Sequence, residues 1–298
     1  MEEGQGGNSK LPGRVKRAAS LSPSLTLGSV IVFAVMVSAI GAPWIAPYNP
    51  EETNASAVLA SPSPTHWLGT DSTGMDILSR IIYAPRVDLT IALLATALSI
   101  LAGTTVGVAA GYHRGWLSEG AMRVSDLLQS FPVYVLGMAL VVLTGHNVQT
   151  LVIAIAVISA PVYARLVRSE VIQLRERLFV DALRASGISS RRIVIKHMLP
   201  NAANPIFAMS SVTIGTSILV TAGLSYIGAG VSIPTPEWGS MIAIGTPNLV
   251  SGGQWWPSVF PGVALALTVL GFALIGDSLP KVLDPRNRVK ASQWALSV

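Results

Sequence analysis

Five long stretches of the chain contain no Asp, Glu, Lys or Arg, and they determine how the rest of the sequence is organised. They cover residues 18–50, 89–113, 127–164, 197–236 and 238–276. A helix needs about 20 apolar residues to cross the hydrocarbon core of a bilayer. Each stretch is long enough for at least one such helix, so the chain is predicted to be an all-α polytopic membrane protein.

Turn-forming residues divide the longer stretches into separate spans. Gly145-His146-Asn147-Val148-Gln149-Thr150 interrupts the third stretch and predicts a tight turn between two short spans. Pro200 and Pro205 open the fourth stretch, which favours a span over 206–229. The first half of the fifth stretch is predicted to be a loop, because it contains Pro247, Gly252, Gly253 and Pro257. The span follows over 258–277. Six membrane helices are therefore expected, centred near residues 34, 99, 136, 157, 217 and 268.

Basic residues are distributed very unevenly between the segments that join these helices. If the N-terminus lies inside, 18 of the 20 Lys and Arg residues fall on the inner side, and only Arg80 and Arg86 fall outside. Cytoplasmic segments of membrane proteins carry such an excess of basic residues. Both termini are therefore predicted to be cytoplasmic. Topology also accounts for the net charge of +5 without a nucleic-acid partner.

This topology divides the chain into five parts. In order, they are a cytoplasmic tail (1–22), the first membrane helix (23–46), an extracytoplasmic segment (47–86), a core of five further membrane helices that includes a cytoplasmic loop over 167–205 (87–280), and a second cytoplasmic tail (281–298). The extracytoplasmic segment ends in a stretch of helical character, Asp76–Arg86.

Composition excludes several kinds of chemistry. Only 12% of the residues are charged, about half the share of a typical soluble domain. With no cysteine, the chain has no disulfide, thiolate nucleophile or Cys-ligated metal. Its four histidines are too far apart for a helical metal-binding pair, and it lacks a Gly-x-x-x-x-Gly-Lys-Ser/Thr loop for ATP phosphates. The chain is therefore expected to be no enzyme and to hold no metal or cofactor itself.

The loop over 167–205 has a helix–glycine–helix pattern. A short helix is favoured by Val180-Asp181-Ala182-Leu183-Arg184-Ala185-Ser186, with Asp181 and Arg184 paired at i,i+3. Gly187 suits a left-handed position that ends this helix, and Ser189 or Ser190 can cap a second one. Leu199-Pro200-Asn201 is expected to break the second helix at the membrane. The pattern fits binding by a cytosolic protein and, equally well, a hairpin lying on anionic headgroups.

The segment FVDALRASGISSRRIVIKHMLPN (179–201) resembles the EAA loop of ABC importer permeases, whose pattern is E-A-A, three residues, Gly, nine residues, I-x-L-P. The positions that match at this spacing are Asp181, Ala182, Gly187, Leu199 and Pro200. Leu183 replaces the second Ala, and His197 stands where Ile is usual. The stretches 23–50, 66–86, 125–140, 224–245 and 260–286 are similar to the C-type permease of dipeptide and oligopeptide importers.

This resemblance implies a type I ABC importer permease in the bacterial cytoplasmic membrane. The implied partners are a second homologous permease, one or two ABC ATPase subunits that bind ATP and Mg²⁺, an extracytoplasmic substrate-binding protein, membrane lipid and a short peptide substrate. Translocation is implied to occur by alternating access. The residues implied to couple the chain to the ATPase are Asp181, Ala182, Leu183, Arg184, Ala185, Ser186, Gly187, Leu199 and Pro200.

Other functions stay open at this point. The same kind of machine carries nickel and other small solutes. An ion-coupled secondary transporter is a further alternative, but it normally has charged groups near the midplane and broken helices. None of the six predicted spans has a charge at its centre. A membrane scaffold would need no helix–glycine–helix loop.

Overall fold

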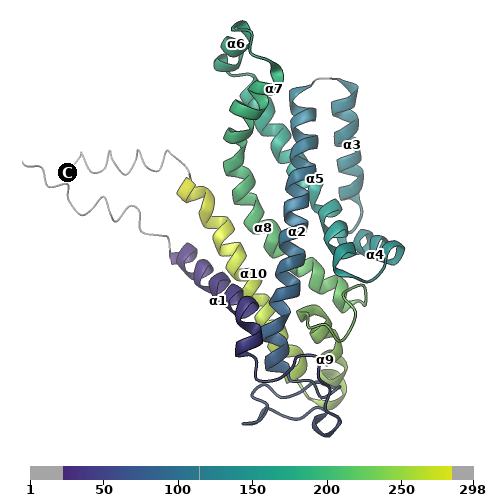
Figure 1. Ribbon diagram of the computed structural model, residues 1–298. Coiled ribbons are helices and arrows are strands. Elements are labelled where there is room, and N and C mark those ends of the chain that lie inside the picture. Colours follow the sequence, from purple (N-terminus) through teal and green to yellow (C-terminus); the bar gives the residue numbers. More distant parts are fainter. Residues whose placement is uncertain (1–22, 114, 284–298) are drawn as a thin grey trace, which may run out of the picture.

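Helices make up most of the part of the chain that this computed structural model describes, residues 23–113 and 115–283 (Figure 1). The α-helices are α1 (Pro23–Ile45), α2 (Ile77–Tyr112), α3 (Trp116–Ser130), α4 (Val133–Thr144), α5 (Val148–Arg175), α6 (Leu178–Ala185), α7 (Ser190–Ile193), α8 (Leu199–Tyr226), α9 (Trp238–Gly252) and α10 (Trp256–Leu283). Two short turns are named η1 (Ala55–Ala57), a 3-10 turn, and η2 (Val194–Met198), a π-helical turn. The all-α prediction is confirmed.

Five of the described helices are long and apolar enough to cross a membrane. They are α1, α2, α5, α10 and the continuous helix Ser190–Tyr226, which contains α8. The sixth predicted span corresponds to α3 and α4, which meet at an angle of 95°. Pro132 separates the two, because a residue before proline is driven out of the helical conformation and Phe131 is extended. With 12 residues, α4 alone is about 18 Å long and cannot cross a bilayer.

The loop predicted before the last span is wrong, because most of it forms α9. The side chain of Glu237 caps this helix and accepts the N–H groups of Gly239 and Ser240, each at 2.8 Å. Two otherwise unpaired donors of the first turn are thereby satisfied. Helix α9 passes through Pro247 and ends at Gly253, which has a φ of +70°. By contrast, the tight turn predicted before Thr150 is confirmed and joins α4 to α5.

The predicted helix break at Leu199-Pro200-Asn201 is also wrong, since one helix runs from Ser190 to Tyr226. Pro200 has no N–H to donate to the carbonyl four residues earlier. The preceding turn widens instead, and the Leu199 N–H bonds to the Val194 oxygen, five residues back, in η2. The second half of the predicted loop, from Ser190, and the following span therefore form one continuous helix.

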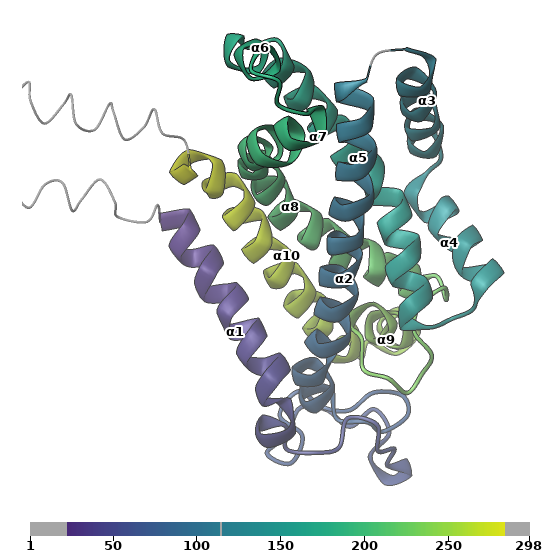
Figure 2. The same ribbon diagram turned by 45° about the horizontal axis from the view of Figure 1, so that its top comes forward.

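Helices α2 and α5 lie side by side at the centre of the bundle (Figure 2). Three glycines of α2, spaced four residues apart, allow this close approach: Gly103, Gly107 and Gly111. A Cβ atom on Gly107 would lie 2.5 Å from the carbonyl oxygen of Ala164 and 2.9 Å from the Cβ of Val167. Small residues at this spacing are typical of tightly packed membrane helices.

The beginning of α1 and the end of α10 lie together, where Ser278 Oγ donates to Ser24 Oγ at 3.2 Å. The segment between α1 and α2 lies at the opposite end of these two helices (Figure 1). This arrangement agrees with termini on one side of the membrane. The predicted tails, 1–22 and 281–298, fall outside the described residues, except that α10 extends to Leu283.

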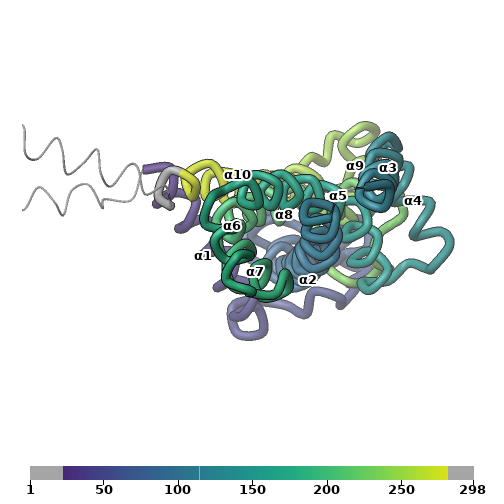
Figure 3. Tube along the Cα trace, turned by 90° about the horizontal axis from the view of Figure 1, so that it is seen from above, coloured from purple at the N-terminus to yellow at the C-terminus, as the bar shows by residue number. Residues whose placement is uncertain are grey.

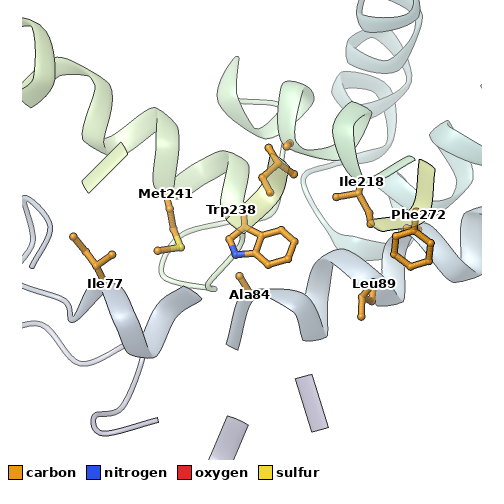
Figure 4. Close-up of a cluster of buried hydrophobic side chains, with 10 residues drawn as sticks. Ile77, Ala84, Leu89, Ile218, Trp238, Met241 and Phe272 are labelled. Carbon is orange, nitrogen blue, oxygen red and sulfur yellow. The ribbon is translucent and has the colours of Figure 1, made fainter. Parts of the chain in front are cut away.

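A buried cluster joins α2, α8, α9 and α10. Trp238, at the start of α9, is buried and packs among Ile77 and Ala84 of α2, Ile218 of α8 and Phe272 of α10 (Figure 4). A side chain of this size contributes several kcal/mol by its burial. The first turn of α9 is therefore held in this cluster, and farther along the helix Ser258 Oγ of α10 donates to the Ile242 carbonyl oxygen at 3.2 Å.

A buried cation helps to fix the segment between α1 and α2. Arg80, on the first turns of α2, donates through Nη1 to the carbonyl oxygens of Pro50 at 2.9 Å and Pro234 at 3.0 Å. Its Nε lies 3.8 Å from Asp71 Oδ2. Helix α2 is continuous from Ile77, so the predicted boundary at residue 86 does not coincide with a helix end.

Candidate functional site

Helices α6 and α7 form an elbow (residues 178–193) that projects beyond the other helices at one end of the bundle (Figure 1). Seen from above, the elbow lies over the ends of α2 and α8 (Figure 3). Its two short helices are anchored by Val180 and Ile193, which are fully buried against Val171 of α5 and Met198 of η2. The elbow is therefore a folded extension of the bundle.

Gly187 ends α6 in the predicted left-handed conformation, with a φ of +76°. Its N–H donates to the carbonyl oxygen of Arg184 at 3.0 Å, and the N–H of Ile188 donates to that of Leu183 at 3.1 Å. These two bonds form a Schellman motif, which satisfies the last carbonyl groups of a helix. The chain then turns into α7, whose N-cap is Ser189.

The predicted coupling residues lie at two places on this structure. Residues 181–187 share the projecting tip, where all are exposed to solvent except the half-buried Leu183. Leu199 and Pro200 lie at the start of α8, beyond η2, and belong to the base of the elbow. Asp181 and Arg184 form the predicted ion pair at 3.3 Å. Because both side chains are largely exposed, this pair contributes at most about 1 kcal/mol.

A polar pocket of about 500 Å³ lies beside α6. Its lining comes from the end of α2, the end of α5 and α6: Tyr112, Arg175, Glu176, Asp181 and Arg184. Arg175 Nη1 donates to the carbonyl oxygens of Gly111 and Tyr112, both at 3.1 Å, and so joins the ends of α5 and α2. The Arg184 guanidinium lies 5.8 Å from the centre of the Tyr112 ring. Sequence reasoning missed Tyr112 and Arg175, because the hydrogen bonds that join the ends of α2 and α5 link residues 63 and 64 positions apart.

A second pocket, of about 340 Å³, opens at the other end of the helix that begins in the elbow. Tyr226 and Ser225, at the end of α8, face Ala243 of α9 and His146 of the turn before α5. The hydroxyl of Ser225 is buried and has no hydrogen-bond partner among the described residues. The two pockets therefore lie at opposite ends of the continuous helix Ser190–Tyr226.

Solved structures with a similar fold include an inward-facing form of the MetNI methionine ABC transporter. The match has a TM-score of 0.57 at 21% sequence identity and covers 70% of this chain and 98% of that one. At this level of identity the likeness concerns the fold, which is that of a type I importer permease.

Curated relatives are more similar in sequence. The dipeptide transport system permease protein DppC of Alkalihalophilus pseudofirmus is 39% identical over 262 residues, which cover 88% of this chain and 86% of the relative. The glutathione transport system permease protein GsiD of Pectobacterium atrosepticum is 35% identical over 258 residues, with coverage of 86% and 85%.

The family model described as "Binding-protein-dependent transport system inner membrane component" matches residues 103–289. This range includes the elbow and the helices on either side of it. It covers well over half of the chain. The protein thus belongs to the family of binding-protein-dependent transport system inner membrane components.

Proposed function

We propose that this chain is the permease subunit of an ATP-driven importer and that it translocates short peptides by alternating access. A member of its family is a multi-pass protein of the bacterial cytoplasmic membrane. The peptide substrate is supported by the relatives, whose names refer to dipeptide and glutathione transport. Glutathione is itself a short peptide. Neither name favours nickel or an ion-coupled mechanism.

The projecting elbow is the structural observation that best supports this proposal. Its tip presents a row of small side chains, Ala182, Ala185 and Ser186, followed by Gly187. Such a surface allows a partner protein to pack closely, and close packing transmits force without slack. Its base is buried between α5 and α8. We propose that an ATPase subunit binds residues 181–187 and that Leu199 and Pro200 pass its movement to α8.

The proposed assembly contains further subunits. A second homologous permease completes the translocation path, and an extracytoplasmic substrate-binding protein delivers the peptide. One or two kinds of ATPase subunit bind ATP and Mg²⁺, and hydrolysis takes place there. The sequence of this chain supports that division, because it has no phosphate-binding loop of the Gly-x-x-x-x-Gly-Lys-Ser/Thr type.

Disulfide crosslinking tests the position of the ATPase. The chain has no cysteine, so a single cysteine at Ala185 reports on one site only. We expect it to crosslink to a cysteine in the cleft of the ATPase subunit in membranes, with a yield that changes when ATP is added. The measurement is the amount of crosslinked product on a non-reducing gel.

A cysteine at Ser251 provides the matched control. Ser251 is also exposed but lies at the end of α9, away from the elbow (Figure 1). We expect it to give no crosslink with the same ATPase cysteine. If Ala185 also gives none in a complex shown to be assembled, the elbow does not bind the ATPase, and a hairpin on lipid headgroups becomes the better account.

A further inference from the structure

Two acidic side chains meet in the interior at the outer end of the bundle. Asp88 lies on α2 and Glu237 is the N-cap of α9, and both are 0% exposed. Asp88 Oδ2 accepts the backbone N–H of Trp238 at 3.3 Å. Both oxygens of Glu237 accept backbone N–H groups of α9. The Trp238 N–H that Asp88 accepts belongs to the residue directly after Glu237, so the two buried carboxyl groups lie close together.

No described Lys or Arg forms an ion pair with either carboxyl group. Arg80 lies two turns earlier on α2. Its Nη1 donates to the carbonyl oxygens of Pro50 and Pro234, and its Nε pairs with Asp71. Arg86 is exposed and lies over the ring of Tyr83. The nearby charges therefore leave the pair without a neutralising cation.

The neighbouring helices do not supply a charge either. Helices α1 and α9 contain no ionisable side chain, and the only such residue of α8 is the exposed Tyr226. On α5 the first ionisable residue is Tyr163, which packs against Gly103, 15 residues beyond Asp88. On the described part of α10 the first ionisable residue is Asp277. It lies beside Ser278, near the C-terminal end of α10. Glu237 is the titratable group that faces Asp88.

A hydrogen bond between two carboxyl groups requires a proton, because an ionised carboxylate can only accept. Asp88 Oδ1 receives no hydrogen bond from an N–H or O–H group of the described residues. If Asp88 Oδ1 carries a proton, its O–H group can donate a hydrogen bond to a carboxylate oxygen of Glu237, and Oδ1 then has a partner. Glu237 accepts two N–H groups at the N-terminus of α9, where the helix dipole stabilises negative charge. Without the proton, two negative charges would be buried unpaired at a large cost in free energy.

We propose that Asp88 and Glu237 form a proton-binding site that fastens α9 to α2. The bound proton lies on Asp88 Oδ1 and is shared with Glu237. When it dissociates, the two carboxylates repel each other and the first turn of α9 is released from α2. This inference concerns a site at the opposite end of the bundle from the elbow and stands independently of the transported substrate.

Infrared difference spectroscopy detects the proton directly. We expect the assembled wild-type transporter at neutral pH to show the C=O stretch of a protonated carboxyl group, shifted in D₂O. Asp88→Asn should lose this band, and Glu237→Gln should keep it at a shifted frequency, because the proton on Asp88 then faces an amide in place of a carboxylate. The control Asp126→Asn, which changes an exposed carboxylate, should retain it. Absence of the band from the wild type, or its persistence in Asp88→Asn, would overturn the proposal.

The pH dependence of stability gives a second test, and Asp88→Asn is suited to it. Its amide N–H₂ replaces the shared proton as donor to Glu237, and its oxygen still accepts the Trp238 N–H. A folded state that binds an extra proton loses stability as pH rises. We expect the thermal midpoint of the wild-type transporter to fall as the pH rises above the usual range of a carboxyl group, and that of Asp88→Asn to fall less. Equal pH dependence, or dependence on Na⁺ at constant pH, would contradict a proton site.

Discussion

Gly187→Val is expected to abolish transport while the permease still inserts into the membrane. The φ of +76° at this position is left-handed, and a β-branched residue there is strained by about 1–2 kcal/mol or more. No atom lies within 4 Å of an added Cβ, so the effect comes from the backbone alone. The end of α6 would rearrange, and the tip would lose the shape that we propose the ATPase binds. Peptide uptake by cells that carry the variant measures the effect.

Gly187→Asn is the matched control for this experiment. Asparagine adopts the left-handed conformation far more readily than valine, and its side chain has room. We expect it to retain most of the uptake. Normal uptake by Gly187→Val, with both variants present in the membrane in equal amounts, would refute a coupling role for the turn.

Gly107→Ala is expected to destabilise the membrane bundle strongly, although it adds a single methyl group. The new Cβ would lie 2.5 Å from the Ala164 carbonyl oxygen, which belongs to the backbone of α5 and cannot rotate away. Helices α2 and α5 must separate, which costs about 1–3 kcal/mol or more. The thermal midpoint in detergent and the amount of protein in the membrane should both fall.

The same substitution at Gly262 should have the opposite effect. Gly262 lies within α10, and an added Cβ there meets nothing within 4 Å. Alanine favours a helix over glycine by up to about 1 kcal/mol. We therefore expect Gly262→Ala to be neutral or stabilising. If the two variants behaved alike, close contact between α2 and α5 could not be the reason for glycine at position 107.

The features that the sequence predicted correctly are those decided by neighbouring residues. Gly187 ends α6 because a glycine follows a short helix former, and the turn before Thr150 forms because Gly145 and Asn147 favour it. Long uncharged stretches located the spans because the membrane imposes a minimum length. These signals need no knowledge of the tertiary structure.

The features that were missed depend on distant contacts. The sequence predicts a helix break at Pro200, but in η2 the Leu199 N–H bonds to the Val194 oxygen and the helix continues. It predicts a loop around Pro247, but Glu237 caps a helix that begins at Trp238 and passes through this proline. Asp88 and Glu237 border the uncharged stretches from which the spans are predicted, and a residue at such a border is expected to lie in water. Their burial is decided by the packing of α9 on α2, 150 residues apart in sequence.

The continuity of the helix from Ser190 to Tyr226 sets how a signal can cross the membrane. Its 37 residues span about 55 Å. If an ATPase moves the elbow as we propose, this helix would turn as one body, and Tyr226 would move without a relay of side-chain changes. The pocket beside Tyr226 would then widen or narrow at the same time as the elbow moves. The size of this change would depend on where along the helix the rotation is centred.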